Sequence, residues 1–578
     1  MATFEVWAPS AGLVQVRIGD TTTDLAERDG GWWQGSAGAE HGTDYSYVID
    51  GGQPLPDPRS RWQPGGVHGP SRYYDDGQYQ WADSRWSGRQ LAGSVVYECH
   101  VGTFTPGGTF DSAIERLDHL VALDVDLIEL LPVNAWDGVS GWGYDGVDWY
   151  AVHAPYGGPD GLKRFVDACH NRGIGVLLDV VYNHLGPSGA YLDSFGPYFT
   201  DRHATPWGLT VNLDGPGSDQ VRRHIIDNAV MWLRDYHLDG LRLDAVHALT
   251  DSRATHLLEE LAVEVEALSA SVNRPLSLIA ESDLNDPRLV TAREAGGYGL
   301  TAQWSDDFHH ALHAALTGER HGYYGDFGAL SSLAKTLTGV FFHDGTWSSS
   351  RRRRHGRPIN TGVVPGHRFL GYLQNHDQIG NRATGDRVSD TLPPGLLKVG
   401  AALVLTSPFT PMLFMGEEWA ASTPWQFFTS YTEPALAEAV VVGRWSEFAE
   451  HGWATHDVPN PQHRGTFERS KLDWSEIGEP AHTEVLDFYR KAIAVRRQRA
   501  ELTDSALSGI TVDFSEEARW LVVARSGLRV ACNLAEHRQT VPLDGAPRAV
   551  LLSSSPGFVY SDGKVELDGG SVVVVELA

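Results

Sequence analysis

Residues 240–247 read Gly-Leu-Arg-Leu-Asp-Ala-Val-His, an apolar run that ends in charged side chains. A β-strand presents alternate side chains on one face, so Arg242 and Asp244 share a face, and the guanidinium would keep the carboxylate ionised. We therefore expect a buried strand with a polar group at its carboxyl end. In α/β barrels, this end of a strand is where the chemistry is carried.

Runs of the same kind alternate with amphipathic stretches from Ser94 to about Leu502. The strand candidates are 95–101, 126–132, 175–182, 240–246, 276–281, 300–306, 369–375 and 411–415. The helix candidates are 112–123, 160–172, 219–236, 254–268, 396–406 and 482–497. Eight strands alternating with helices favour a (β/α)8 TIM barrel over an open, doubly wound sheet.

Short alternating segments, separated by Gly, Pro and Asp, lie on both sides of this region and are typical of antiparallel β structure. We predict an N-terminal β-sandwich over residues 1–90, similar to a carbohydrate-binding domain, and a C-terminal antiparallel β domain over 503–578. The catalytic barrel would occupy 91–502, with a short excursion after the third strand at about 185–218.

The composition is that of a globular protein with an acidic surface. The 578 residues include 74 acidic and 46 basic side chains, for a formal charge of -28, which disfavours nucleic acid and anionic membranes as partners. A neutral or cationic ligand is expected instead. The three cysteines are scattered, no secretory signal pattern opens the chain, and no apolar run approaches the roughly 20 residues of a membrane span. These features predict a cytoplasmic protein.

Four predicted strand ends carry ionisable side chains: 179–184, 240–247, 279–282 and 374–378. Each acid taken alone could be a helix cap or an ion-pair partner. Together they would converge at the barrel mouth, and paired carboxylates are what glycoside cleavage requires. The chain lacks the short motifs of zinc peptidases, phosphate-binding loops, dinucleotide folds and nucleophile elbows.

In this order, the four strand ends resemble the signature regions of the α-amylase superfamily, glycoside hydrolase family thirteen. The resemblance implies that Asp244 is the nucleophile, Glu281 the general acid/base and Asp377 the acid that stabilises the transition state. It also implies that substrate is contacted by Arg242, His184, His376, Tyr144 and the neighbouring Asp145. Tyr144 would stack against the sugar, although a core aromatic is the alternative.

A narrower resemblance involves residues 281–287, 303–313, 375–382 and 414–419, which are similar to those of maltooligosyltrehalose trehalohydrolases. It implies retaining hydrolysis of the α-1,4 bond next to a terminal trehalose, on a substrate made by a maltooligosyltrehalose-forming enzyme. The substrate-binding candidates it adds are Asp306, Asp307, His309, His310, Gln378, Asn381, Arg382 and His247. Helix capping by Asp306 and Asp307, and a supporting role for His247 and Gln378, are the alternatives.

No cofactor or metal is expected. Many α-amylases use a longer excursion after the third strand to complete a calcium site, and here only Asn183 matches one of its ligand positions. The basic run 351–354 is interpreted as a solvated loop. Two other functions stay open: a branching or debranching enzyme of the same superfamily, and a non-catalytic glycan-binding relative, which would be expected to lose one of the three acids.

Overall fold

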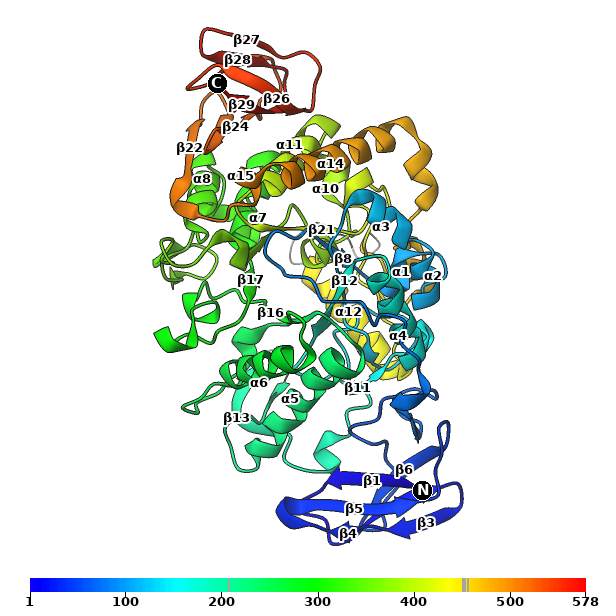
Figure 1. Cartoon of the computed structure of the whole chain (residues 1–578). Coiled ribbons are helices and arrows are strands. Elements are labelled where there is room, and N and C mark those ends of the chain that lie inside the picture. Colours follow the sequence, from blue (N-terminus) through cyan, green and yellow to red (C-terminus); the bar gives the residue numbers. More distant parts are fainter. Residues whose placement is uncertain (206–207, 450–453, 455–456) are drawn as a thin grey trace.

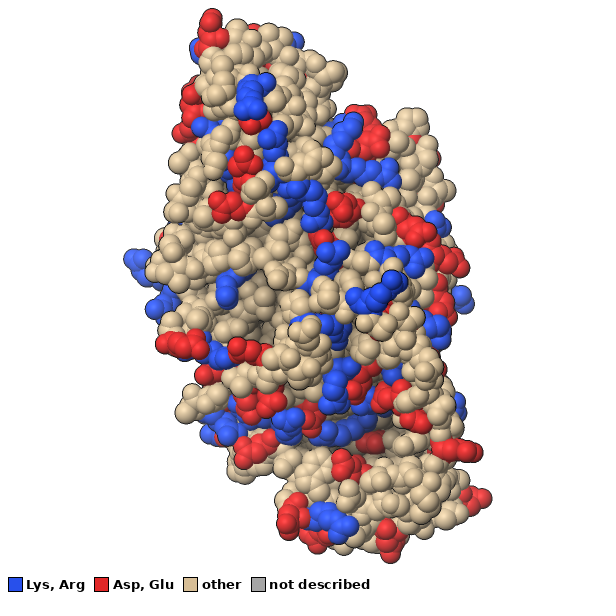
Figure 2. Space-filling view, in the orientation of Figure 1, with Lys and Arg blue, Asp and Glu red and all other residues tan. Residues whose placement is uncertain are grey.

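The structure is a computed structural model that describes residues 1–205, 208–449, 454 and 457–578. The N-terminal strands lie at one end of an elongated molecule, the helices and parallel strands fill the middle, and the C-terminal strands lie at the other end (Figure 1). On the face shown in Figure 2, acidic and basic side chains are interspersed, so the excess of acid forms no single-sign surface there.

Eight parallel strands close into a barrel in the order β12-β15-β16-β17-β20-β21-β8-β9. Every one overlaps a run that the sequence predicts, and the predicted TIM barrel is confirmed. The strands are β8 (Val96–Cys99), β9 (Leu127–Leu130), β12 (Gly175–Val180), β15 (Gly240–Leu243), β16 (Ser277–Ala280), β17 (Ala302–Trp304), β20 (Phe369–Gly371) and β21 (Thr410–Phe414).

The barrel interior is layered because side chains alternate along each strand. The first inward positions form an apolar cluster that includes Val96, Leu127, Leu177, Ile279, Leu370 and Met412. Two residues further along the first four strands stand buried polar side chains, Glu98, Glu129, Asp179 and Arg242. The apolar cluster therefore forms the floor of the barrel interior. The buried polar side chains form a charged layer directly above this apolar floor.

Helices surround the barrel much as predicted. They include α4 (Gly158–His170), α5 (Ser218–Asp235), α6 (Leu257–Val272), α7 (Asp306–Thr317), α8 (Leu330–Gly339), α11 (Pro394–Thr406), α12 (Pro434–Ala449) and α14 (Pro480–Gln498). The excursion between β12 and α5 contains a hairpin of β13 (Phe199–Thr205) and β14 (Gly208–Val211).

The single helix predicted over 112–123 is wrong, because the chain forms α2 (Phe110–Ile114) and α3 (Leu117–Leu123) instead. The amide of Arg116 bonds to the carbonyl of Ala113, which tightens the turn and ends α2. Each piece buries one apolar face, Phe110 and Ala113 in α2 and Leu117, Leu120 and Leu123 in α3, so the amphipathic pattern continues across the break.

Two antiparallel sheets form the N-terminal region, as predicted. One has the order β1-β5-β4 and the other β3-β2-β6-β7. Their ranges are β1 (Ala2–Trp7), β2 (Val14–Ile18), β3 (Thr21–Asp24), β4 (Ala26–Glu27), β5 (Trp32–Ala37), β6 (Asp44–Ile49) and β7 (Ser71–Arg72). The rings of Phe4 and Tyr45 meet between the sheets with centroids 4.9 Å apart.

The C-terminal region also consists of two antiparallel sheets, β22-β23-β24-β29-β26 and β25-β28-β27. Their strands are β22 (Ile510–Ser515), β23 (Trp520–Arg525), β24 (Leu528–Asn533), β25 (Gln539–Pro542), β26 (Pro547–Ser553), β27 (Val559–Ser561), β28 (Lys564–Leu567) and β29 (Ser571–Leu577). Beyond β22, the carboxylate of Glu516 accepts hydrogen bonds of 2.9 Å from the amides of Leu330 and Ser331 at the start of α8. A long-range contact thus satisfies two free amides of a barrel helix. Among the described residues, no helix is long and apolar enough to cross a bilayer.

Gly240 allows β15 to enter the barrel between its neighbours. A Cβ atom here would lie 2.5 Å from the carbonyl oxygen of Ser277 and 2.8 Å from a methyl carbon of Leu177. We expect Gly240→Ala to lower the free energy of unfolding by about 1–3 kcal/mol through overpacking, measured by urea denaturation. Gly443→Ala, on α12 with no atom within 4 Å of the added carbon, is the control and should not destabilise the protein. Equal losses in the two variants would contradict the close-packing argument.

Candidate active site

The three predicted catalytic acids lie at the carboxyl ends of barrel strands. Asp244 follows β15, Glu281 follows β16, and Asp377 lies in α9 (His376–Gly380), which follows β20. All three keep part of their side chain exposed, at 12%, 18% and 37% respectively. They are therefore accessible from the barrel mouth.

The Arg242 side chain is completely buried and joins the carboxylates to one another. Its Nη1 atom lies 2.7 Å from Asp179 Oδ2 and 2.7 Å from Asp244 Oδ1, so the predicted pairing with Asp244 is present. Its Nη2 atom lies 3.1 Å from Glu281 Oε2. Asp244 and Glu281 are thus held on neighbouring nitrogens of a single guanidinium.

The second oxygen of Asp244 is held by Asn183, whose Nδ2 donates to Oδ2 over 2.8 Å. The Oδ1 atom of Asn183 lies 2.5 Å from His184 Nδ1, and His184 Nε2 lies 3.0 Å from the carbonyl of Tyr144. Asn183, which the sequence suggested only as a possible calcium ligand, therefore orients Asp244. In the described part of the chain, no group of three or more His, Cys, Asp or Glu side chains is placed to hold a metal ion.

Glu281 has the environment of an acid that stays protonated. Its Oε2 accepts a 2.6 Å hydrogen bond from the amide of Ala245. Removal from water raises the pKa of Glu281 well above its usual range, and the charges of Asp244 and Asp377 raise it further against the opposing effect of Arg242. A neutral carboxyl group is what donation of a proton to a leaving oxygen requires.

Asp377 has the opposite environment. Burial alone would raise its pKa, but the neighbouring charge of His376 lowers the pKa of Asp377 below its usual range. His376 Nε2 lies 3.4 Å from Asp377 Oδ1. The site thus combines an ionised acid with a neutral one.

Tyr144 lies beside this group and is only partly buried. Its hydroxyl donates a 2.5 Å hydrogen bond to Asp179, and its ring stacks on His376 with centroids 5.1 Å apart. Burial raises the pKa of Asp179 to about 6. Asp145 is also partly buried; burial raises its pKa, and a hydrogen bond from Tyr431 opposes that rise.

The side chains of the cluster predicted after the sixth strand point in two different directions. Asp306 accepts a 2.5 Å hydrogen bond from Tyr372, and burial raises the pKa of Asp306 to about 6. His310 packs on Tyr323, whose exposed fraction is 42%, with ring centroids 4.5 Å apart. Residues four apart share one face of a helix, which leaves both Asp306 and His310 partly exposed.

The prediction that Asp307 faces the substrate groove is not supported, and His309 is buried at the edge of the pocket that Gln378 and Arg382 also line. Around the helix axis, Asp307 points about 100° away from Asp306, and its side chain is buried. Its Oδ2 accepts hydrogen bonds from the amides of Phe342 and His343 and from the side chain of Asn285, at 2.7, 3.0 and 2.8 Å. His309 is fully buried and bonds to the carbonyl of Leu373 and the hydroxyl of Tyr324, at 2.9 and 3.0 Å. These two side chains support the loops instead.

A hairpin that the sequence did not reveal packs against the loop that carries Glu281. The interpretation of residues 351–354 as a solvated loop is correct for the exposure of 352–354 but wrong for the structure, because β18 (Thr346–Ser348) and β19 (Arg353–His355) pair there. Arg351 turns inward and lies 3.0 Å from Asp283 Oδ2, while residues 352–354 stay exposed. His247 Nδ1 lies 3.9 Å from the other oxygen of Asp283.

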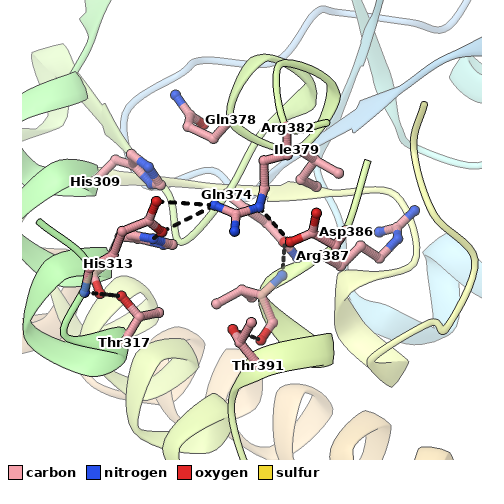
Figure 3. Close-up of a pocket in the computed structure, with 12 residues that line it drawn as sticks. His309, His313, Thr317, Gln374, Gln378, Ile379, Arg382, Asp386, Arg387 and Thr391 are labelled. Carbon is pink, nitrogen blue, oxygen red and sulfur yellow. Dashed lines mark hydrogen bonds and ion pairs between the residues drawn. The ribbon is translucent and has the colours of Figure 1, made fainter. Parts of the chain in front are cut away.

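The remaining candidates follow Asp377 and border a pocket of about 150 Å³ (Figure 3). Gln378 lines it and accepts a 3.0 Å hydrogen bond from the amide of Asn375. Arg382 spans it, with Nε 2.5 Å from Asp386 and Nη1 3.1 Å from Glu319. Asn381 is exposed nearby.

Comparisons with known proteins agree with this geometry. Residues 70–201 match the α-amylase catalytic domain, and residues 505–574 match a domain family of unknown function, DUF3459. The malto-oligosyltrehalose trehalohydrolase of Arthrobacter ramosus is 54% identical over 99% of both chains, and that of Mycobacterium tuberculosis strain CDC 1551 is 52% identical over the whole of both. The crystal structure of a putative α-amylase from Salmonella typhimurium superimposes with a TM-score of 0.91 at 38% identity and covers 100% of this chain and 97% of its own.

The closed barrel, with its acids at the ends of β15, β16 and β20, defines a glycoside hydrolase of the α-amylase superfamily. Within that superfamily, the full-length similarity shows that the chain belongs to the malto-oligosyltrehalose trehalohydrolase family.

We expect Arg351→Met to lower kcat/KM about 10-fold or more, because Arg351 holds Asp283, two residues after the proposed acid, and small displacements of a catalytic group are costly. Arg353→Met is the matched control on the same hairpin, since Arg353 is exposed and, within the described part of the chain, its guanidinium bonds to the backbone carbonyl of Arg354 alone. Its activity should stay within about twofold of the wild type. Steady-state kinetics on an α-1,4-glucan would measure both, and equal losses would argue against a role for the Arg351–Asp283 contact.

Proposed function

We propose that this protein hydrolyses the α-1,4-glucosidic bond next to the terminal trehalose of maltooligosyltrehalose and releases trehalose. The single observation that carries the chemistry is the placement of Asp244 and Glu281 on one buried guanidinium, with the pKa of Glu281 raised. The full-length relatives, which are malto-oligosyltrehalose trehalohydrolases, support the choice of substrate. The reaction class and the substrate thus have separate support.

The mechanism we assign is double displacement with retention of configuration. Asp244 attacks the anomeric carbon while Glu281 gives its proton to the departing glycosidic oxygen, which leaves as the trehalose hydroxyl. Glu281, now a carboxylate, then takes a proton from water, and that water displaces Asp244 from the covalent glycosyl-enzyme. Asp377 stabilises the positive charge that develops on the sugar, and His376 helps to hold its hydroxyl groups.

The trehalose end and the setting of the reaction are also part of the proposal. Three side chains near the barrel mouth could bind an uncharged sugar: the carboxyl group of Asp306, the imidazole of His310 and the exposed ring of Tyr323. A preceding enzyme that forms maltooligosyltrehalose would supply the substrate in the cytoplasm. The three cysteines are free and buried, which fits a reducing compartment.

We expect Asp244→Asn and Glu281→Gln each to lower kcat by several orders of magnitude, because both groups act in the transition state. Azide should partly restore release from an activated glycoside in Glu281→Ala with retention, and in Asp244→Ala with inversion. Product anomers can be followed by NMR, and an unchanged thermal midpoint would show that the fold is intact. Near-normal turnover in either isosteric variant would rule out these roles.

The enzyme should prefer trehalose-capped chains over plain maltooligosaccharides by about 100-fold or more in kcat/KM, because polar groups left unpaired cost about 1–3 kcal/mol each. His310→Ala should reduce that preference more than it slows cleavage of the plain chain. Asp307→Ala is the comparison: it leaves the amides of Phe342 and His343 unpaired, so it should lower stability and affect both substrates alike. A preference unaffected by His310→Ala would place selectivity elsewhere.

A further inference from the structure

Two buried glutamates lie below the proposed site and take no part in the mechanism described above. Glu98 on β8 and Glu129 on β9 are paired in register, and each is only 1% exposed. Both stand in the charged layer of the barrel, above the apolar floor. Carboxyl groups so far from water need a specific partner or must be neutral.

Glu98 contacts His376 with both of its oxygens. Its Oε1 lies 2.5 Å from the ring Nδ1, and its Oε2 accepts a 3.1 Å hydrogen bond from the backbone amide of the same residue. This geometry suits a carboxylate, which can only accept hydrogen bonds, opposite an Nδ1 that carries a proton. One side chain therefore fixes the ring, its tautomer and the start of α9 together.

Three aromatic rings pack against the ring of His376. Tyr144 stacks on it, and Trp142 and Trp304 meet it edge-on, with centroids 6.0 and 5.9 Å away. Its other nitrogen, Nε2, faces Asp377 Oδ1 at 3.4 Å. The ring thus lies directly between Glu98 below and Asp377 above.

The charges around His376 favour its cationic form. The ionisable groups that interact electrostatically with it are Asp377 from α9, Glu98 from β8, Glu129 from β9, Asp179 from β12 and His100 from the start of α1 (Val101–Phe104). Arg242 from β15 acts on Asp377 in turn. Burial opposes the charge, but Asp377 and Glu98 raise the pKa of His376 well above its ordinary range.

Glu129 has a different environment from its neighbour. Burial, together with the charge of Glu98, raises the pKa of Glu129 well above its usual range, and its Oε2 has no hydrogen-bond partner among the described residues. A neutral Glu129 adds no charge below the ring, where Glu98 is the carboxyl group that contacts His376 directly. The two residues are therefore a matched pair for a test.

We propose that Glu98 is a positioning residue for the glycosidase reaction, which keeps His376 as a fixed imidazolium with its Nε2 proton directed toward Asp377 and the reacting sugar. This rests on the proposed function only in its use of α-glucan hydrolysis as the assay. The proton stays on His376 through both displacements, so Glu98 neither gives nor receives one. Its effect is to maintain a positive charge and a hydrogen-bond donor beside Asp377.

The test is Glu98→Gln, with Glu129→Gln as the control, assayed on maltooligosaccharide or an aryl maltotrioside over a range of pH. We expect Glu98→Gln to lower kcat about 10-fold or more with KM within about threefold, and to move the alkaline limb of the kcat profile down by about one pH unit or more. Glu129→Gln should keep the wild-type profile. An unmoved profile in Glu98→Gln, or the same shift in both variants, would overturn the proposal.

Two further measurements separate positioning from a structural effect. In a His376→Gln background, Glu98→Gln should add less than about a twofold loss, whereas additive losses would show that Glu98 does not act through His376. Nitrogen NMR of the histidine rings, with His376 assigned by its variant, should show an imidazolium in the wild type at about pH 8, above the ordinary histidine range. A neutral His376 ring in the wild type at that pH would refute the proposal, even if Glu98→Gln fails to fold or the wild type cleaves no glucan. Failure of the wild type to cleave any glucan would count against the proposed function alone.

Discussion

A guanidinium with no exposed surface organises the acids of this barrel. Arg242 binds Asp179 and Asp244 through one nitrogen and Glu281 through another, and its charge lies over the Trp304 ring at 4.1 Å. Because the carboxylates belong to three neighbouring strands, their positions depend on the register of those strands around one cation. Buried ion pairs contribute little net stability, yet removal of one partner is severe, so such a group defines geometry more than it strengthens the fold.

The barrel could be predicted because parallel strands buried on both faces appear as continuous apolar runs. Asp244 and Glu281 come directly after β15 and β16, whereas the run before Asp377 continues beyond the end of β20 at Gly371. All three acids still lie at the mouth. The division of 112–123 into two helices could not be predicted, because its amphipathic pattern continues across the break at Arg116. Pattern reports which face is buried, and local hydrogen bonds decide where a helix ends.

The site was predicted less completely than the barrel. The helical period of 3.6 residues places Asp306 and His310 on a different face of the helix from Asp307. The prediction nevertheless grouped all three as one cluster. The contact of Arg351 with Asp283 had no such signal, since the two lie 68 residues apart and any of four arginines could have made it. Glu98 is recognisable in the sequence as a charged residue inside an apolar strand run, but only the structure shows that His376 is its partner.

The contact of Glu516 with the start of α8 also affects how barrels and C-terminal sheets can be recombined. The carboxylate takes the place of a helix cap for Leu330 and Ser331, although it comes from a part of the chain almost two hundred residues away. A chimera that exchanges the C-terminal sheets must bring an acid to the same point, or supply a new capping residue within the barrel. The barrel and the C-terminal sheets are therefore best exchanged together. A junction placed at the boundary of the sheets alone would separate the capping acid from the helix that it caps.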